Sequence, residues 1–187
     1  MQMTKRNTKV AFLAQSAVMA AVLCILSPLA VPIGPIPITL GVFAVMLTGA
    51  MLDWKRACAA VAVYILLGCI GLPVFSGGKG GFAVLAGPTG GYLWSYLPMA
   101  AIIALMGGRT RANYLAESAW VGLGCLISLL ACYALGTLQF TLVSGSDWAH
   151  ALTVCVYPFI PFDLGKLVCA SLLGAQVRRR LRAAGLN

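Results

Sequence analysis

Apolar residues fill most of the chain in long runs that short polar segments separate. A transmembrane helix needs about 20 predominantly apolar residues, with a range of about 17–25. The pattern predicts six spans, at residues 10–29, 38–52, 57–72, 89–107, 115–138 and 149–177, of which the second is short. We expect Pro158 and Pro161 to break the last run, with Pro161 in the first turn of the final helix, where proline is tolerated.

The connections between these runs differ in composition. Four prolines at residues 28–37 exclude a regular helix and favour a short extended segment. The connection at residues 73–88 is rich in glycine, which suits either a flexible loop or a lid that closes over a ligand. Residues 139–150 are mixed and polar, and we expect Ser146 and Asp147 to cap a short helix there.

Composition assigns the chain to the membrane. Of 187 residues 61% are hydrophobic and 9% are charged, whereas a soluble domain has about 25% charged residues. No polar stretch is long enough for a separate soluble domain. We therefore expect an all-α integral membrane protein with one domain at 1–187: a tail at 1–9, a six-helix bundle at 10–177 and a basic tail at 178–187. The first apolar run is too long for a signal peptide, so we expect a retained helix.

The basic residues predict the orientation of the bundle. With six spans, eleven of the 13 lysines and arginines lie on one side of the membrane, and Lys79 lies on the other. The remaining one, Lys166, lies within a span. The positive-inside rule therefore predicts six helices with both termini cytoplasmic. The short basic clusters suit this role and give no reason to expect nucleic-acid binding.

Cysteine spacing gives no sign of a metal or redox site. The seven cysteines all lie in apolar stretches, and no two of them form a CxxC motif. We interpret them as small, soft residues that fill gaps between helices. We therefore expect no metal and no cofactor.

Two ionisable residues lie within the last apolar run, where charges are rare and usually functional. Asp163 and Lys166 are three residues apart and so share one helix face. They could form a buried ion pair that locks two helices together, or they could bind a small anionic ligand that also carries N–H donors. In the second case Lys166 would bind a carboxylate and Asp163 would accept the N–H groups.

Glycine-rich segments provide further candidate ligand contacts. The run Gly77-Gly-Lys-Gly-Gly81 lacks the G-x-x-x-x-G-K-[ST] pattern of a phosphate-binding loop, so nucleotide binding is not expected there. The segment Gly87-Pro-Thr-Gly-Gly-Tyr92 could simply punctuate the start of the fourth span. Alternatively, glycines such as Gly91 could let a ligand approach the backbone, with Thr89 and Tyr92 beside it.

A pair of small residues marks one face of the first span. Ala17 and Ala21 are four residues apart, a spacing that lets two helices approach closely. The pair could pack inside the bundle or could receive a separate membrane subunit.

Three motifs together resemble the BioY family, the substrate-binding S components of energy-coupling factor (ECF) biotin transporters. They are Pro73-Val-Phe-Ser-Gly-Gly, Gly87-Pro-Thr-Gly-Gly-Tyr-Leu93 and Pro158-Phe-Ile-Pro-Phe-Asp-Leu-Gly-Lys166. The resemblance extends from about Val10 to Arg182. The chain departs from the family at Phe162, where glycine is more frequent, and at Gly165, where leucine is common.

The resemblance implies a six-helix protein of the cell membrane that has no ATPase activity and is not an enzyme. It would capture biotin from outside and dock to a transmembrane coupling subunit and two ATPase subunits. Tyr92, Asp163 and Lys166 would line the biotin site. Ala17 and Ala21 would face the coupling subunit.

The chemistry of biotin suggests further contacts within that resemblance. Biotin has an anionic tail, a ureido ring with two N–H donors and a carbonyl, and an apolar thiophane ring. Phe75, Tyr92 and Tyr157 would contact the thiophane, and Thr89 would donate to the ureido carbonyl.

The sequence leaves other functions open. The chain could be an S component for another vitamin. A self-sufficient secondary transporter could be coupled through protonation of Asp163, but inverted repeats and paired broken helices are not evident. A membrane enzyme would have to rely on His150 with Asp147 nearby, and a capped polar turn explains both residues.

Overall fold

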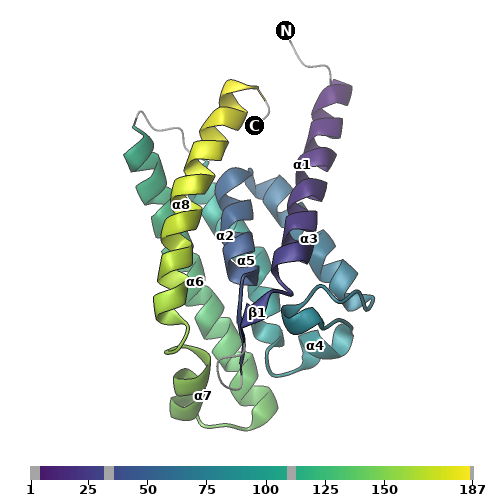
Figure 1. Cartoon of the computed structure of the whole chain (residues 1–187), viewed down its shortest axis with the longest axis vertical. Helices are drawn as coiled ribbons and strands as arrows, with labels where there is room; N and C mark the ends of the chain where they lie inside the picture. The colour runs from purple at the N-terminus through teal and green to yellow at the C-terminus, as the bar shows by residue number, and fades with distance from the viewer. Residues whose placement is uncertain (1–4, 32–35, 109–112, 186–187) are drawn as a thin grey trace.

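The computed structural model describes residues 5–31, 36–108 and 113–185, and their secondary structure is almost entirely helical (Figure 1). The helices are α1 (Lys5–Leu26), α2 (Gly41–Met51), α3 (Trp54–Cys69), α4 (Phe82–Ala86), α5 (Gly90–Gly107), α6 (Tyr114–Ser144), α7 (Trp148–Cys155) and α8 (Ile160–Ala183), with a 3-10 turn at Ser76–Gly78. Two short strands, β1 (Ala30–Val31) and β2 (Ile38–Thr39), pair antiparallel. The predicted all-α class is confirmed.

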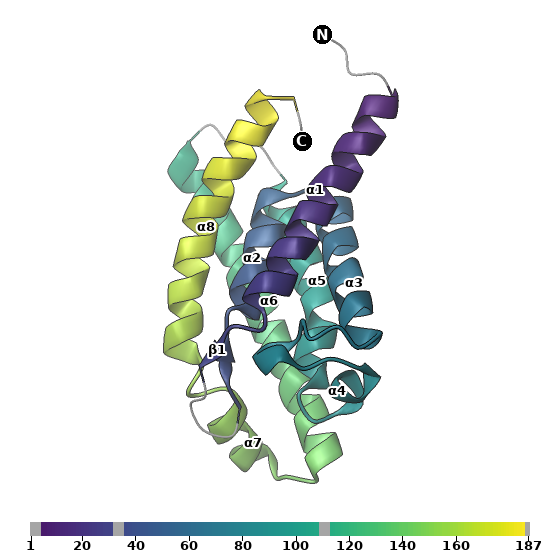
Figure 2. The same ribbon diagram turned by 45° about the vertical axis from the view of Figure 1, so that its right-hand side comes forward.

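The longer helices lie side by side along the long axis of the molecule (Figures 1 and 2). Helix α5 packs against α2, α3 and α6, while α8 packs against α2 and α6, and α1 packs mainly on α3. The start of α1 and the end of α8 lie at the same end of the bundle. The β-strands, α4 and α7 gather at the opposite end, which we call the loop end.

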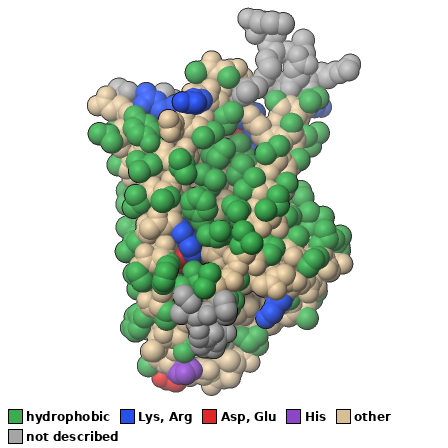
Figure 3. Space-filling model, viewed as in Figure 1, with side chains coloured by type: hydrophobic (Ala, Val, Ile, Leu, Met, Phe, Trp, Pro, Cys, Tyr) green, Lys and Arg blue, Asp and Glu red, His purple; other side chains and the backbone are tan. Residues whose placement is uncertain are grey.

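Helix length and composition identify membrane-crossing segments. Helices α1, α5, α6 and α8 are each long and apolar enough to cross a membrane. Helices α2 and α3, with 11 and 16 residues, are shorter. Hydrophobic side chains cover most of the middle of the face in Figure 3, and basic side chains are visible at the end where α8 finishes. The protein is thus a membrane protein with several apolar helices.

The predicted break in the last apolar run is confirmed. Helix α7 ends at Cys155 and α8 begins at Ile160, with Pro161 in its first turn. Asp147 caps α7, because its carboxylate accepts a hydrogen bond from the Ala149 N–H at 3.2 Å. In the described part of the proline-rich connection, Pro28 lies in the turn after α1, and Ala30–Val31 is extended as β1. Residues 32–35, with two of its four prolines, lie outside the described residues.

The predicted end of the fifth span is wrong, since α6 continues to Ser144 rather than ending near residue 138. The polar side chains in these last turns all find hydrogen-bond partners while the backbone remains helical. The Gln139 amide donates to the Leu85 and Gly87 carbonyls, each at 2.8 Å. The Thr141 and Ser144 hydroxyls donate to carbonyls of α6 itself. Polarity therefore did not mark the helix end.

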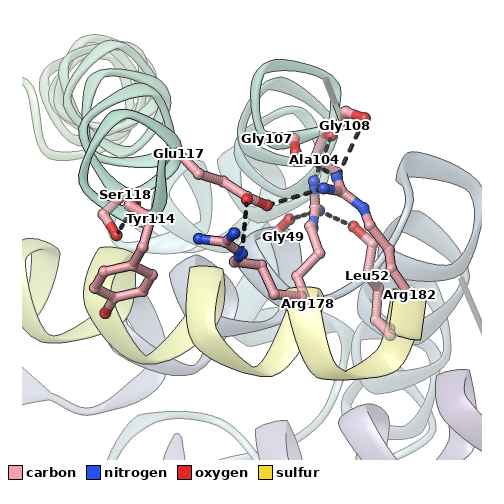
Figure 4. Close-up of polar contacts among 11 residues, drawn as sticks. Gly49, Leu52, Ala104, Gly107, Gly108, Tyr114, Glu117, Ser118, Arg178 and Arg182 are labelled. Atoms are coloured by element: carbon pink, nitrogen blue, oxygen red, sulfur yellow. Dashed lines mark hydrogen bonds and ion pairs between the residues drawn. The ribbon is translucent and has the colours of Figure 1, made fainter. Parts of the chain in front are cut away.

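A buried polar cluster joins the helices at the end opposite the loops (Figure 4). The Arg178 side chain is 1% exposed, and its guanidinium donates to the carbonyls of Gly49, Leu52 and Ala104. Arg182 donates to the buried carboxylate of Glu117 at 2.9 Å. Arginine thus satisfies carbonyls at the C-terminal ends of α2 and α5, which have no partner within their own helices. Residues 178–183, expected in a basic tail, form the last turns of α8.

Candidate functional site

A cavity of about 150 Å³ lies at the loop end of the bundle. A buried water needs about 10–15 Å³ on this measure, so the cavity has room for a small organic molecule. Its lining residues come from α2, α3, α5, α6 and α8 and from the connections above them: Ser27, Ile36, Pro37, Thr39, Val42, Tyr64, Phe75, Ser76, Lys79, Val84, Thr89, Tyr92, Leu93, Tyr96, Cys132, Tyr133, Cys155, Phe159, Asp163 and Lys166. The break before α8 places Asp163 and Lys166 at this cavity.

Asp163 is the centre of a buried polar network on the cavity wall. Its side chain is 3% exposed, and Lys166 Nζ lies 2.8 Å from its Oδ1. The Tyr133 hydroxyl of α6 donates to Oδ2 at 2.7 Å. Lys166 also donates to the Thr39 carbonyl of β2 at 2.7 Å. The ion pair that the sequence left as one of two alternatives is present, but both of its members belong to α8. The hydrogen bonds with Tyr133 and with the Thr39 carbonyl connect the pair to α6 and β2.

The network retains capacity for a ligand. An ionised carboxylate offers about four acceptor positions and an ammonium offers three donors. The hydrogen bonds within the protein use two acceptor positions of Asp163 and two donors of Lys166. The pair can therefore serve a ligand that presents N–H donors and a carbonyl acceptor side by side.

Aromatic rings form an apolar wall beside this network. Tyr64 and Phe75 pack edge to face, with their centroids 5.6 Å apart and an interplanar angle of 81°. Tyr96 stacks on Tyr64 at 6.3 Å. Phe75 is fully buried and packs directly on Gly68, where an added Cβ would overlap the Phe75 ring. Only glycine allows this ring position.

The buried Phe75 ring anchors the glycine-rich connection over the cavity. The Phe75 N–H donates to the Lys79 carbonyl at 2.9 Å, and the Gly78 N–H donates to the Phe75 carbonyl at 3.0 Å. Gly77 and Gly78 have φ angles of 67° and 73°, which glycine adopts at no steric cost. The Gly81 N–H donates to the Gly68 carbonyl at 2.7 Å. The connection thus forms a defined turn with Lys79 at the cavity.

Five of the seven residues proposed from sequence as ligand contacts line the cavity: Phe75, Thr89, Tyr92, Asp163 and Lys166. Tyr92 is held by a hydrogen bond from its hydroxyl to the Cys155 carbonyl at 3.3 Å. The structure places Gly91 and Tyr157 elsewhere. Gly91 packs on α6, where an added Cβ would lie 2.5 Å from the Leu135 carbonyl oxygen. Tyr157 is 59% exposed and does not line the cavity.

Sequence reasoning missed several residues that the helix packing brings to the cavity. Tyr64, Tyr96 and Tyr133 lie within predicted spans, and all three line it. Their hydroxyl groups in apolar runs were a signal, because a buried polar group requires a partner. Thr39 accepts the hydrogen bond from Lys166 through its backbone carbonyl, and the identity of its side chain gave no sign of this contact.

Ala17 and Ala21 lie on the outside of the bundle. Both are exposed, and Val18 and Ile25 on the same helix are 62% and 67% exposed. Within the described residues the pair therefore does not serve internal packing. The two alanines thus form a patch of small residues on the exposed face of α1, where another helix could pack closely.

The described residues contain no group of three or more His, Cys, Asp or Glu side chains that could hold a metal ion. All seven cysteines are free. Cys132 and Cys155 line the cavity, where they contribute small apolar surface.

Comparison with known proteins agrees with this geometry. The model of the BioY family matches residues 2–183. The chain is 36% identical over 176 residues to the biotin transporter BioY2 of Lactococcus lactis, covering 94% of each protein. It is 39% identical over 169 residues to the biotin transporter BioY of Thermotoga maritima, covering 89% of this chain and 95% of that one. A crystal structure of the S component for biotin from an ECF-type ABC transporter superposes with a TM-score of 0.83, at 31% identity and 95% coverage of both chains.

Proposed function

The chain belongs to the BioY family, and from this premise we propose that it is the biotin-binding S component of an ECF-type transporter. It captures biotin at the loop end and delivers it together with separate coupling and ATPase subunits. The observation that carries this proposal is the network of Asp163 and Lys166 in a cavity with an aromatic wall.

The polar and apolar side chains of the cavity are of the types that the polar and apolar parts of biotin require. The ureido ring needs acceptors for two N–H groups and a donor for its carbonyl, and Asp163 and Lys166 offer both. The bicyclic ring needs apolar surface, and the Tyr64, Phe75 and Tyr96 rings provide it. Tyr92 and Thr89 complete the proposed contacts from the start of α5. Ligand sites of this kind are mostly apolar with a few placed polar groups.

We propose that six helices span the cell membrane in one domain, with both termini cytoplasmic. Helices α2 and α3 would cross together with α1, α5, α6 and α8, since all six lie side by side (Figures 1 and 2). The basic residues support this orientation, because Lys55, Arg56 and the arginines of α8 belong to the end at which α1 begins. The loop end, with the cavity, would then face outside.

The exposed surface around Ala17 and Ala21 is the proposed docking site for the coupling subunit. In a membrane, helices associate through close packing, and small residues let their backbones approach. The energy for transport would come from two separate ATPase subunits, a proposal supported by the similarity to the S component of an ECF-type ABC transporter.

Retention of labelled biotin by the purified chain tests this function. Binding that unlabelled biotin displaces, and that other vitamins do not, supports a biotin S component. Uptake by the chain alone in proteoliposomes with a proton gradient would instead indicate a self-sufficient transporter.

A further inference from the structure

Three charged side chains line the cavity, and their charges do not sum to zero. They are Asp163, Lys166 and Lys79, so the lining carries one net positive charge. Asp163 and Lys166 form an ion pair at 2.8 Å and therefore neutralise one another. The net charge belongs to Lys79.

The acidic residues of the chain are all engaged away from Lys79. The chain has four of them. Asp53 pairs with Arg56, Glu117 pairs with Arg182 and Asp163 pairs with Lys166, while Asp147 caps the N-terminus of α7. No ion pair joins Lys79 to a carboxylate in the part of the chain that the structure describes. The charge of Lys79 is therefore available to an anionic ligand.

Burial places the two cationic groups at different depths. The Lys166 side chain is 12% exposed and Asp163 is 3% exposed, whereas Lys79 is exposed. The paired charges thus lie in the interior of the cavity and Lys79 lies at its rim. Val42, Val84 and Leu93 also line the cavity and add apolar surface.

A second polar group accompanies Lys79 on the same turn. The Ser76 side chain lines the cavity, and its Oγ is buried without a hydrogen-bond partner in the described residues. The backbone bonds between Phe75 and Lys79 close the turn that carries both side chains. A buried hydroxyl without a partner costs free energy, so a ligand acceptor at this position would be favourable.

We infer that Lys79, with the Ser76 hydroxyl beside it, binds the carboxylate of the ligand at the cavity rim, while Asp163 and Lys166 bind its ureido ring inside. The inference rests on the proposed function and adds to it a residue that selects the anionic tail. It replaces the assignment of the carboxylate to Lys166. Two hydrogen bonds within the protein already engage Lys166, and its charge is compensated.

The test compares biotin with a neutral biotin amide by isothermal titration of the purified chain. Lys79→Gln removes the charge and is expected to weaken biotin binding by about five- to ten-fold, which is about 1–1.4 kcal/mol. Its affinity for the amide is expected to equal that of the wild type. Lys79→Arg keeps the charge and is expected to keep the wild-type preference for biotin. Ser76→Ala is expected to weaken biotin binding with the amide less affected.

Lys55→Gln is the matched control, since Lys55 is an exposed lysine at the start of α3, away from the loop end. It is expected to change neither affinity. Rising ionic strength is expected to weaken the binding of biotin to the wild type more than to Lys79→Gln, because salt screens exposed charges.

Two results would overturn the inference. Equal losses for biotin and the amide in Lys79→Gln would show that the residue supports the loop rather than the carboxylate. Unchanged biotin affinity in Lys79→Gln would show that the carboxylate lies elsewhere. Both differ from a failure of the proposed function, in which the wild-type chain itself would not bind biotin.

Discussion

The hydroxyl of Tyr133 in α6 donates to Oδ2 of Asp163 in α8 at 2.7 Å. This bond joins two helices that both line the cavity, and it satisfies a carboxylate oxygen that is almost completely buried. Hydrogen bonds to charged groups contribute about 1.5–3 kcal/mol. Tyr133 therefore holds Asp163 in position for the ligand.

Replacing Tyr133 by Phe is expected to lower both thermal stability and biotin affinity. The change leaves the ring in place and removes only the donor, at a cost of about 1.5–3 kcal/mol. Melting in detergent and titration with biotin measure the two effects. Tyr157→Phe is the control, because Tyr157 is exposed and lies off the cavity. Equal behaviour of the two variants would contradict the role of Tyr133.

Gly136→Ala is expected to displace Tyr92 and weaken biotin binding. A Cβ at position 136 would overlap the Tyr92 ring, and overpacking of this kind costs about 1–3 kcal/mol. Gly165→Ala in α8 is the matched control, since nothing lies within 4 Å of a Cβ there. Alanine is the better helix former, so the control is expected to keep affinity and to gain a little stability. Wild-type biotin affinity in Gly136→Ala would show that binding does not depend on the position of the Tyr92 ring.

Arg178→Leu is expected to destabilise the bundle without changing the site. It leaves the Gly49, Leu52 and Ala104 carbonyls without their donor, and each buried unsatisfied group costs about 1–3 kcal/mol. The melting temperature should fall, while biotin affinity well below that temperature should stay within about two-fold. Arg180→Leu, at an exposed position of α8, should alter neither quantity. A large loss of affinity in Arg178→Leu would show that the two ends of the bundle are coupled.

Ala17→Leu is expected to block transport while sparing ligand capture. The added bulk lies on the exposed face of α1, where we propose that the coupling subunit packs closely. Biotin binding by the isolated chain should be unchanged, and ATP-driven uptake by the reconstituted complex should fall. Ala119→Leu, at an exposed alanine of α6, provides the control. Normal uptake by Ala17→Leu would show that the coupling subunit does not pack closely at this position.

The sequence predicted those parts of the fold and site that depend on local pattern. Apolar runs located the helices, Pro158 and Pro161 located the break before α8, and the two charges in that run identified Asp163 and Lys166. The surroundings of these charges could not be predicted. Tyr133 is 30 residues from Asp163 along the chain and Thr39 is 127 residues from Lys166, and only helix packing brings them together.

The two expected contacts that lie off the cavity have the same explanation. Gly91 is a candidate because glycine lets a ligand approach the backbone closely. In the structure α6, and not a ligand, packs closely against it. Tyr157 is a candidate for its aromatic ring, and the turn between α7 and α8 leaves that ring exposed. Which neighbour a small or aromatic residue meets is decided by tertiary structure.

Retention of labelled biotin by the purified wild-type chain tests the central claim most directly. Thiamin and riboflavin serve as competitors beside unlabelled biotin. The proposed function predicts that the chain retains labelled biotin, that unlabelled biotin displaces it and that neither of the other vitamins does so. Failure to retain biotin, or displacement by thiamin or riboflavin as effective as by biotin, would contradict it.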